Sequence, residues 1–536
     1  MKIQVILIVW FTVHTHVYAQ PTDSAKTIPK SVAETAADID QLFEAAWKRK
    51  GVECAPSATD EEFVRRLYLD LAGRIPAASE TREFLRSTSA TKRSELVERL
   101  LDGPAFVRHF TIVWRNALIP QAFNEPGTRG LVPGFEAWLW THFSQGTPYD
   151  QMVRELLTTS IDLGENQTGL LQSASSPSAF FIVRQMLPEN LATGTSRAFL
   201  GVRLDCAQCH DHPFDKWKHD QFWNMAAFYA GFQRPDAAAA ADPAMMMNFR
   251  ENLTAHSIQV PTTGNVVTAK FLTGAEPEWT DETAPRRLLA DWITARDNPW
   301  FAAMAANRLW AQFMGQGIVQ PIDDFSEKNP PSHPDVLNLL SEQFVAHHYD
   351  LKFLVRAITL TRVYQTTSRQ THASQSDPTQ FARAALRGLT PEQFFDSLAE
   401  ATGYYQPYRT DNPFVIDADT PRARFLELFR DETESPLMKE TTILQALAMM
   451  NGDFIDKATT LDNSQTLRAV AEFPLMTLEE KLNTLFVAAL SRSPTDSERV
   501  AFEKFLADGG TDGNPQKALA DVFWALLNSS EFLLNH

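Results

Sequence analysis

The chain has 536 residues, of which 44% are hydrophobic and 21% are charged. This length predicts several compact units, and the composition is typical of a globular protein that can bury a large core. The net charge of −17 argues against a nucleic-acid binder, because phosphate backbones are bound by clustered Lys and Arg side chains.

The first residues are typical of a cleavable signal peptide over residues 1–19. Met1-Lys2 precedes an apolar run over 3–13 that is too short to span a bilayer, and Val17-Tyr18-Ala19 is a cleavage site of the small-x-small kind. We expect cleavage after Ala19, a tether over 20–35, and a periplasmic or secreted mature chain. A buried N-terminal helix is the alternative. No later segment is apolar enough to predict a membrane span.

The rest of the chain has mainly helical periodicity, with apolar residues three and four positions apart. One helical module is predicted over 36–233 and a second over 282–536, with a linker over 234–281 between them. Within the linker, residues 256–272 alternate in places around Thr263-Gly264-Asn265, which predicts a β-hairpin. The expected fold is therefore mostly α, with two helical modules joined by a linker that contains one short hairpin.

One helical pattern occurs twice in the sequence. An apolar helix is followed by Arg74-Ile75-Pro76 and Ser79-Glu80 near the N-terminus, and by Arg492-Ser493-Pro494 and Ser497-Glu498 near the C-terminus. The pattern favours a shared helical-hairpin solution over an internal duplication, although both explain it.

The segment Cys206-Ala207-Gln208-Cys209-His210 has the Cys-x-x-Cys-His spacing of c-type haem attachment. Two thiols at this spacing can form thioethers to the two vinyl groups of one haem, and the next imidazole can bind the iron as its proximal ligand. The motif therefore predicts one covalent haem c on Cys206 and Cys209, with His210 on the iron. Predicted export supports this interpretation, since haem is attached covalently on the export side.

Three other interpretations of this cluster stay open. A zinc or other metal site could use both thiolates together with His210, His212 or His219, since such ligands suit tetrahedral zinc. The two thiols could instead form a disulfide or redox pair. The segment could also be purely structural.

Further residues could complete a haem site. Arg203 and Lys216 could pair with the haem propionates, and Trp217 could cover the haem edge, with surface charge and core packing as the alternatives. An iron without a distal ligand would favour small-ligand binding or redox catalysis. The distal ligand is not identified, and its candidates are Met186, Met245, Met246, Met247 and His256.

Three residues outside the motif are also candidates. His333 lies in a proline-rich loop after Asp323 and Asp324, and could be a ligand or acid/base group or simply pack the loop. Arg308 could bind a carboxylate or sulfate group, or pair with an Asp. Cys54 would be a free or intermolecular thiol if haem uses the other two cysteines. Hydrolase and nucleotide-binding motifs are absent from the sequence.

Residues 36–233 resemble the cytochrome-C-like module of exported planctomycete-type proteins, Domain of Unknown Function 1549. That resemblance rests on Phe199-Leu200-Gly201-Val202-Arg203, on the Cys-x-x-Cys-His segment, and on His212-Pro213-Phe214-Asp215-Lys216-Trp217. Residues 284–535 resemble the family's companion module, Domain of Unknown Function 1553. The segments that carry the second resemblance are Asn307-Arg308-Leu309-Trp310, Asn329-Pro330-Pro331-Ser332-His333-Pro334, Tyr349-Asp350-Leu351-Lys352, Leu389-Thr390-Pro391-Glu392-Gln393, Leu444-Gln445-Ala446-Leu447 and Leu526-Leu527-Asn528-Ser529-Ser530-Glu531-Phe532.

The resemblance implies an exported, cytochrome-like protein from proteomes that degrade complex polysaccharides, and it implies no established biochemical role. Our leading hypothesis is an exported c-type haem protein that transfers electrons to or from a partner protein, with a link to polysaccharide degradation. The alternatives are a zinc-containing binding or scaffold protein and a haem redox enzyme with an open iron site. The sequence does not decide whether the protein is an enzyme.

Overall fold

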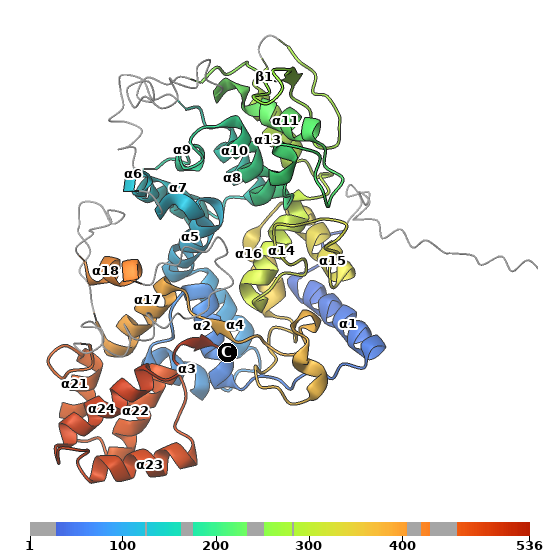
Figure 1. Cartoon of the computed structure of the whole chain (residues 1–536). Helices are drawn as coiled ribbons and strands as arrows, with labels where there is room; N and C mark the ends of the chain where they lie inside the picture. The colour runs from blue at the N-terminus through green and yellow to red at the C-terminus, as the bar shows by residue number, and fades with distance from the viewer. Residues whose placement is uncertain are drawn as a thin grey trace, which may run out of the picture.

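The computed structural model describes residues 28–123, 126–161, 175–232, 251–280, 283–404, 420–428 and 458–536. Helices dominate these residues, which confirms the predicted mostly α fold (Figure 1). The predicted signal peptide and its cleavage site lie outside the described residues.

The N-terminal region is built from short helices. These elements are α1 (Val32–Lys50), α2 (Asp60–Ala72), α3 (Ala78–Arg86), α4 (Lys92–Leu101), α5 (Pro104–Leu118), η2 (Pro120–Phe123), α6 (Pro126–Arg129), α7 (Val132–Gln145), α8 (Tyr149–Thr158), α9 (Ala179–Ile182), α10 (Pro188–Thr195), η3 (Ser196–Leu200), η4 (Asp205–Gln208), α11 (His219–Ala226) and η5 (Ala227–Phe232).

The remaining elements include all the strands of the described ranges. They are β1 (Ser257–Gln259), β2 (Val266–Thr268), α13 (Pro285–Ile293), α14 (Phe301–Met314), α15 (Pro334–Ala346), α16 (Leu351–Thr359), η7 (Ala373–Ser376), η8 (Pro378–Gln380), β3 (Arg387–Gly388), α17 (Pro391–Thr402), α18 (Pro421–Leu428), α21 (Gln465–Glu472), α22 (Leu478–Leu490), α23 (Asp496–Ala507), α24 (Pro515–Leu527) and β4 (Leu534–Asn535).

Helix α1 begins inside the segment that we predicted as a tether over 20–35. Its start is set by a capping box, in which the Ser31 hydroxyl accepts the Glu34 N–H at 3.2 Å and the Glu34 carboxylate accepts the Ser31 N–H at 2.8 Å. The helix ends at Gly51, whose φ of 66° is the left-handed conformation that glycine adopts without strain. The local capping signal thus ends the tether earlier than the composition indicates.

The described strands form two antiparallel pairs. β1 pairs with β2 around the turn Thr263-Gly264-Asn265, which confirms the predicted hairpin. The second pair joins β3 to β4 and was not predicted, because strands of two residues leave no alternating pattern in a sequence. This second pair carries the C-terminal end of the chain back to helix α2, and Figure 1 shows the C-terminus beside α2 and α4.

Two buried hydrophobic clusters form the interior. The larger one extends from Ile39 to Ala382, and within it α1 packs against α15 and α16, as Figure 1 shows. The smaller one contains side chains between Phe394 and Phe532 together with Leu69 and Ile75 from the N-terminal region. Both predicted modules therefore contribute to each cluster. The module bounds themselves stay a prediction.

The two copies of the repeated pattern adopt the same structure. Arg74 donates two hydrogen bonds to Glu80 at 2.9 and 3.1 Å and one to the carbonyl of the next residue. Arg492 donates two hydrogen bonds to Glu498 at 2.8 and 2.9 Å and again one to the carbonyl of the next residue. Each arginine thus fixes the turn between two helices, α2–α3 in one copy and α22–α23 in the other. The bidentate geometry explains why the pattern requires Arg and Glu.

A buried carboxylate connects the two ends of the chain. Asp70 on α2 is fully buried and accepts hydrogen bonds from Arg387 at 2.8 and 2.9 Å. The Tyr364 hydroxyl donates to the same carboxylate at 2.8 Å, and the Asn535 side chain donates at 2.7 Å. A buried charge with this many partners is stabilised only while all of them are in place.

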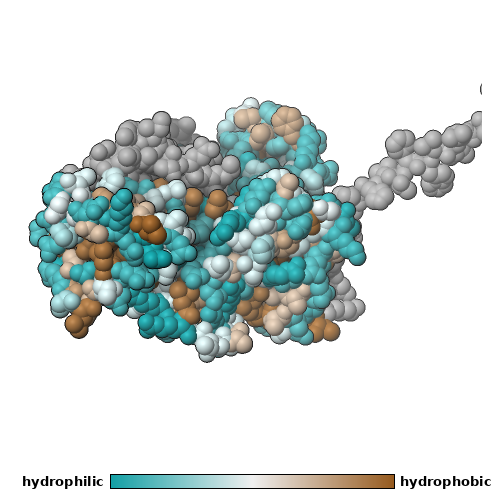
Figure 2. Space-filling model, turned by 90° about the horizontal axis from the view of Figure 1, so that it is seen from below, coloured by the Kyte–Doolittle hydropathy of each residue, from teal (hydrophilic) through white to brown (hydrophobic). Residues whose placement is uncertain are grey.

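The outer surface is largely hydrophilic on the face seen from below, where hydrophobic residues form separate small patches (Figure 2). Patches of this kind are ordinary on protein surfaces. Within the described ranges, no helix combines the length and the hydropathy needed to cross a bilayer.

We predict that Asp70→Asn lowers the free energy of unfolding by about 3–5 kcal/mol, because it leaves a mostly buried Arg387 without its charged partner. Urea unfolding followed by circular dichroism measures this change. Glu83→Gln is the matched control, since it breaks an exposed ion pair with Arg99, and little change is expected there. Equal effects of the two substitutions would show that the buried carboxylate has no special role.

Candidate functional site

The Cys-x-x-Cys-His segment forms an exposed turn with a buried anchor. Leu204 and Ala207 are fully buried, whereas Cys206 and Cys209 are exposed free thiols. The 3-10 turn η4 brings Ala207 N–H to the Leu204 carbonyl at 2.8 Å. The turn therefore places both thiols at the surface, where a large planar reactant can reach them.

His210 follows the turn and is also exposed. Its Nδ1 lies 2.7 Å from the carbonyl oxygen of Asp211. A carbonyl oxygen can only accept a hydrogen bond, so Nδ1 donates, and Nε2 has no hydrogen-bond partner among the described residues. A backbone carbonyl on one imidazole nitrogen and a free second nitrogen is the usual arrangement of a histidine that binds a metal.

A hydrogen-bonded loop closes the segment after His210. The Asp211 carboxylate accepts the backbone N–H of His219 at 3.1 Å and the Lys218 ammonium at 3.0 Å. The His219 hydrogen bond and then the Lys218 hydrogen bond hold the pKa of Asp211 below its ordinary value. The His212 N–H donates to the Trp217 carbonyl at 2.8 Å, so both ends of the loop are fixed.

Trp217 and Lys216, the two loop residues predicted to contact a haem, differ in burial. The Trp217 side chain is 3% exposed and packs against Trp300, with ring centroids 6.3 Å apart. Lys216 is exposed and its ammonium lies 5.1 Å from the centre of the Trp217 ring. Trp217 thus belongs to the core beneath the loop, while Lys216 stays on its outer side.

Arg203 lies before the turn and is held by a carboxylate from a distant part of the chain. Its Nη2 donates to Asp323 at 2.6 Å and its Nε at 3.2 Å, while Arg197 Nε donates to the other oxygen of Asp323 at 2.8 Å. Burial disfavours ionisation of Asp323, but the two arginines outweigh it and hold its pKa below the ordinary value. The sequence analysis named Asp323 only as a neighbour of His333. Its pairing with Arg203 could not be predicted, because the two residues are 120 positions apart.

The histidines of the zinc hypothesis make other contacts. His219 Nε2 accepts the Trp223 indole N–H at 3.1 Å, and His212 Nδ1 accepts the Phe214 N–H at 3.2 Å. In the part of the chain that the structure describes, no three His, Cys, Asp or Glu side chains converge on a common point as metal ligands would. The described residues therefore do not fit a preformed tetrahedral metal site.

The candidates for the distal position are dispersed. Met245, Met246 and Met247 lie outside the described residues. Met186 is almost fully buried in the larger core cluster, and His256 stacks on Trp279 with ring centroids 4.2 Å apart. None of these contacts places a side chain opposite His210.

The three candidates outside the motif have structural contacts. His333 is 5% exposed and packs against Phe43, with ring centroids 4.6 Å apart. Arg308 Nη2 donates to the Ala198 carbonyl at 3.0 Å and so braces η3. Cys54 is a half-buried free thiol whose pKa is raised by burial. We find no exposed acid/base group among them.

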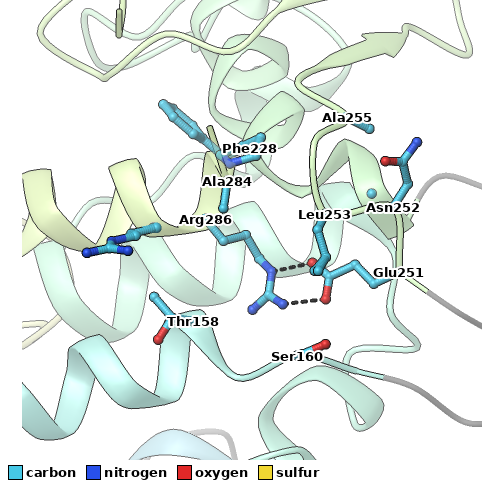
Figure 3. A pocket seen from close by; sticks show the side chains of 12 residues that line it. Thr158, Ser160, Phe228, Glu251, Asn252, Leu253, Ala255, Ala284 and Arg286 are labelled. Atoms are coloured by element: carbon cyan, nitrogen blue, oxygen red, sulfur yellow. Dashed lines mark hydrogen bonds and ion pairs between the residues drawn. The ribbon is translucent and has the colours of Figure 1, made fainter. Parts of the chain in front are cut away.

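A separate cavity of about 180 Å³ lies at the start of α13 (Figure 3). Arg286 and Glu251 form a buried ion pair at its wall, with Nε donating to the carboxylate at 2.5 Å. Arg286 also donates to the carbonyls of Leu157 and Thr159, so its nitrogens are all used within the protein. No residue of the motif lines this cavity, and Arg286 acts there as a clamp between segments.

Two family descriptions match the chain. Residues 38–234 match PSCyt2, a protein of unknown function (DUF1549), and residues 285–424 match PSD1, a protein of unknown function (DUF1553). The chain thus contains a DUF1549 match followed by a DUF1553 match. The order of the two matches is the order expected from the resemblance, and the DUF1549 match contains the whole Cys-x-x-Cys-His turn. No curated protein and no solved structure matches the chain.

We predict that His333 makes unfolding depend on pH. Burial, followed by the charges of Lys50 and Arg49, lowers the pKa of His333 to about 4, whereas an unfolded histidine titrates near 6.5. The unfolded chain therefore binds a proton first, and stability is lost as the pH falls from about 6.5 towards about 4, by up to about 3 kcal/mol. His333→Phe keeps an aromatic ring against Phe43. It should reduce the slope of the free energy of unfolding against pH, which urea unfolding at several pH values measures.

The exposed His372 provides the control, since His372→Asn should leave the slope as it is in the unmodified protein. An unchanged slope in His333→Phe would show that His333 is not a buried neutral histidine. The interpretation of His333 as an acid/base group would then be open again.

Proposed function

We propose that this DUF1549–DUF1553 protein is an exported haem protein of the c type, which transfers electrons to or from a partner protein. Cys206 and Cys209 would hold the haem through thioethers, and His210 would bind its iron. Export rests on the signal peptide predicted over 1–19. A link to polysaccharide degradation stays a prediction from the resemblance alone.

The observation that carries this proposal is the joint presentation of three groups on one turn. Both thiols are exposed and form no disulfide, and the neighbouring imidazole has its Nε2 free. A zinc site would require a further converging ligand, which the described residues do not supply. Attachment of haem requires only that the turn be reachable.

The attachment step balances without an oxidant. Each thiol would add across one vinyl group, so that a carbon–sulfur bond would form and the thiol hydrogen would go to the neighbouring vinyl carbon. Once bound, the haem supplies one-electron chemistry at its iron. The protein's own contribution is to hold His210 in one tautomer and to keep Cys206 and Cys209 accessible during attachment.

We predict that the full chain, exported in a host with c-type haem maturation, carries one haem that survives denaturing electrophoresis and stains for peroxidase activity. Cys206→Ser with Cys209→Ser should lose the stain, because both thioethers are removed. His210→Ala should keep covalent haem but change the visible spectrum, since the iron loses its proximal nitrogen. Cys54→Ser is the matched control and should stain like the unmodified protein.

Two outcomes would contradict the proposal. One is a chain without covalent haem that binds one zinc ion, which would support the scaffold hypothesis. The other is a ferrous spectrum that shifts with carbon monoxide, which would favour a haem enzyme with an open iron site over simple electron transfer.

A further inference from the structure

Asp323 belongs to the segment between α14 and α15, within the DUF1553 match, yet its contacts lie in the DUF1549 match. Its carboxylate binds Arg197 through one oxygen and Arg203 through the other, at distances of 2.6–3.2 Å. The side chain of Asp323 is 16% exposed, so these ion pairs are shielded from water more than ordinary surface pairs are.

The same segment also contacts the backbone before the thiol turn. The Phe325 N–H donates to the Gly201 carbonyl at 2.8 Å. A Cβ on Gly201 would lie 2.4 Å from the Phe325 ring, and Gly201 has a φ of 65°, so only glycine fits this approach. Asp323 and Phe325 therefore hold the chain on both sides of Val202, a few residues before Cys206.

The double contact leaves one nitrogen of Arg203, Nη1, available. Asp323 uses Nε and Nη2 of Arg203, and Nη1 has no partner within the described ranges. The side chain of Arg203 is 39% exposed. A fixed, half-exposed guanidinium with a free N–H next to the thiol turn suits the carboxylate of a haem propionate.

We propose that Asp323 is a positioning residue of the haem site. Through Arg203 and Arg197, this residue of the DUF1553 module fixes the thiol turn of the DUF1549 module. It also holds Arg203 in place to bind a haem propionate. This inference rests on the proposed function, and it assigns to the second module a part in a site that the motif places in the first.

The test compares Asp323→Asn with Asp324→Asn, the adjacent carboxylate, whose side chain makes no such contact. In the chain without haem, amide exchange over residues 197–210 should become about tenfold faster in Asp323→Asn, because charge-assisted hydrogen bonds that hold this segment are lost. In the haem-loaded chain, the reduction potential should change in Asp323→Asn and in Arg203→Gln. Both readouts should be unchanged in Asp324→Asn.

The possible results separate the two proposals. Faster exchange in Asp323→Asn together with a haem-free unmodified chain would overturn the proposed function, and would leave only the part of the inference in which Asp323 fixes the thiol turn. Folded, haem-loaded Asp323→Asn with unchanged exchange and unchanged potential would overturn the positioning role alone. If Asp323→Asn does not fold, Arg203→Gln decides the question, because it breaks the same ion pair at the more exposed partner. An unchanged reduction potential in Arg203→Gln would then overturn the inference.

Discussion

The buried carboxylate of Asp70 is the constraint on which the architecture depends. An ionised group without access to water is stable only inside a complete shell of donors, and this shell comes from three distant places, Tyr364, Arg387 and Asn535. Helix α2, the β3–β4 pair and the segment after α16 must therefore meet at one point. The many short helices, each with little stability of its own, are held in a single arrangement by such long-range polar contacts.

The thiol turn follows a similar rule at the surface. A turn that must expose two cysteines and a histidine cannot gain stability by burying them, so its neighbours provide the support. The buried side chains of Leu204 and Ala207 anchor the turn in the core. The Asp323 carboxylate binds Arg197 and Arg203, which precede the turn. The reactive groups stay accessible because the supporting contacts lie elsewhere.

Local patterns in the sequence predicted the helices and the hairpin, and ligand spacing singled out the Cys-x-x-Cys-His segment, because capping residues, apolar periodicity and ligand spacing all act over a few positions. Contacts between distant residues could not be predicted in the same way. Asp70 and Arg387 are 317 positions apart and Asp323 and Arg203 are 120 apart, and a single Asp or Arg in a sequence gives no sign of its partner. The partner of the buried His333 ring, Phe43, could not be predicted for the same reason.

The guanidinium groups of Arg65 and Arg66 on α2 have a consequence for how the chain folds during synthesis. Arg65 donates to the carbonyls of Ala489 and Phe532, and Arg66 donates to the carbonyl of His536. These acceptors lie 424 to 470 positions after the arginines, so α2 cannot complete these hydrogen bonds until that part of the chain has been made. Helix α2 therefore depends on a distant part of the sequence, unlike the N-terminal segments that fold first in many proteins.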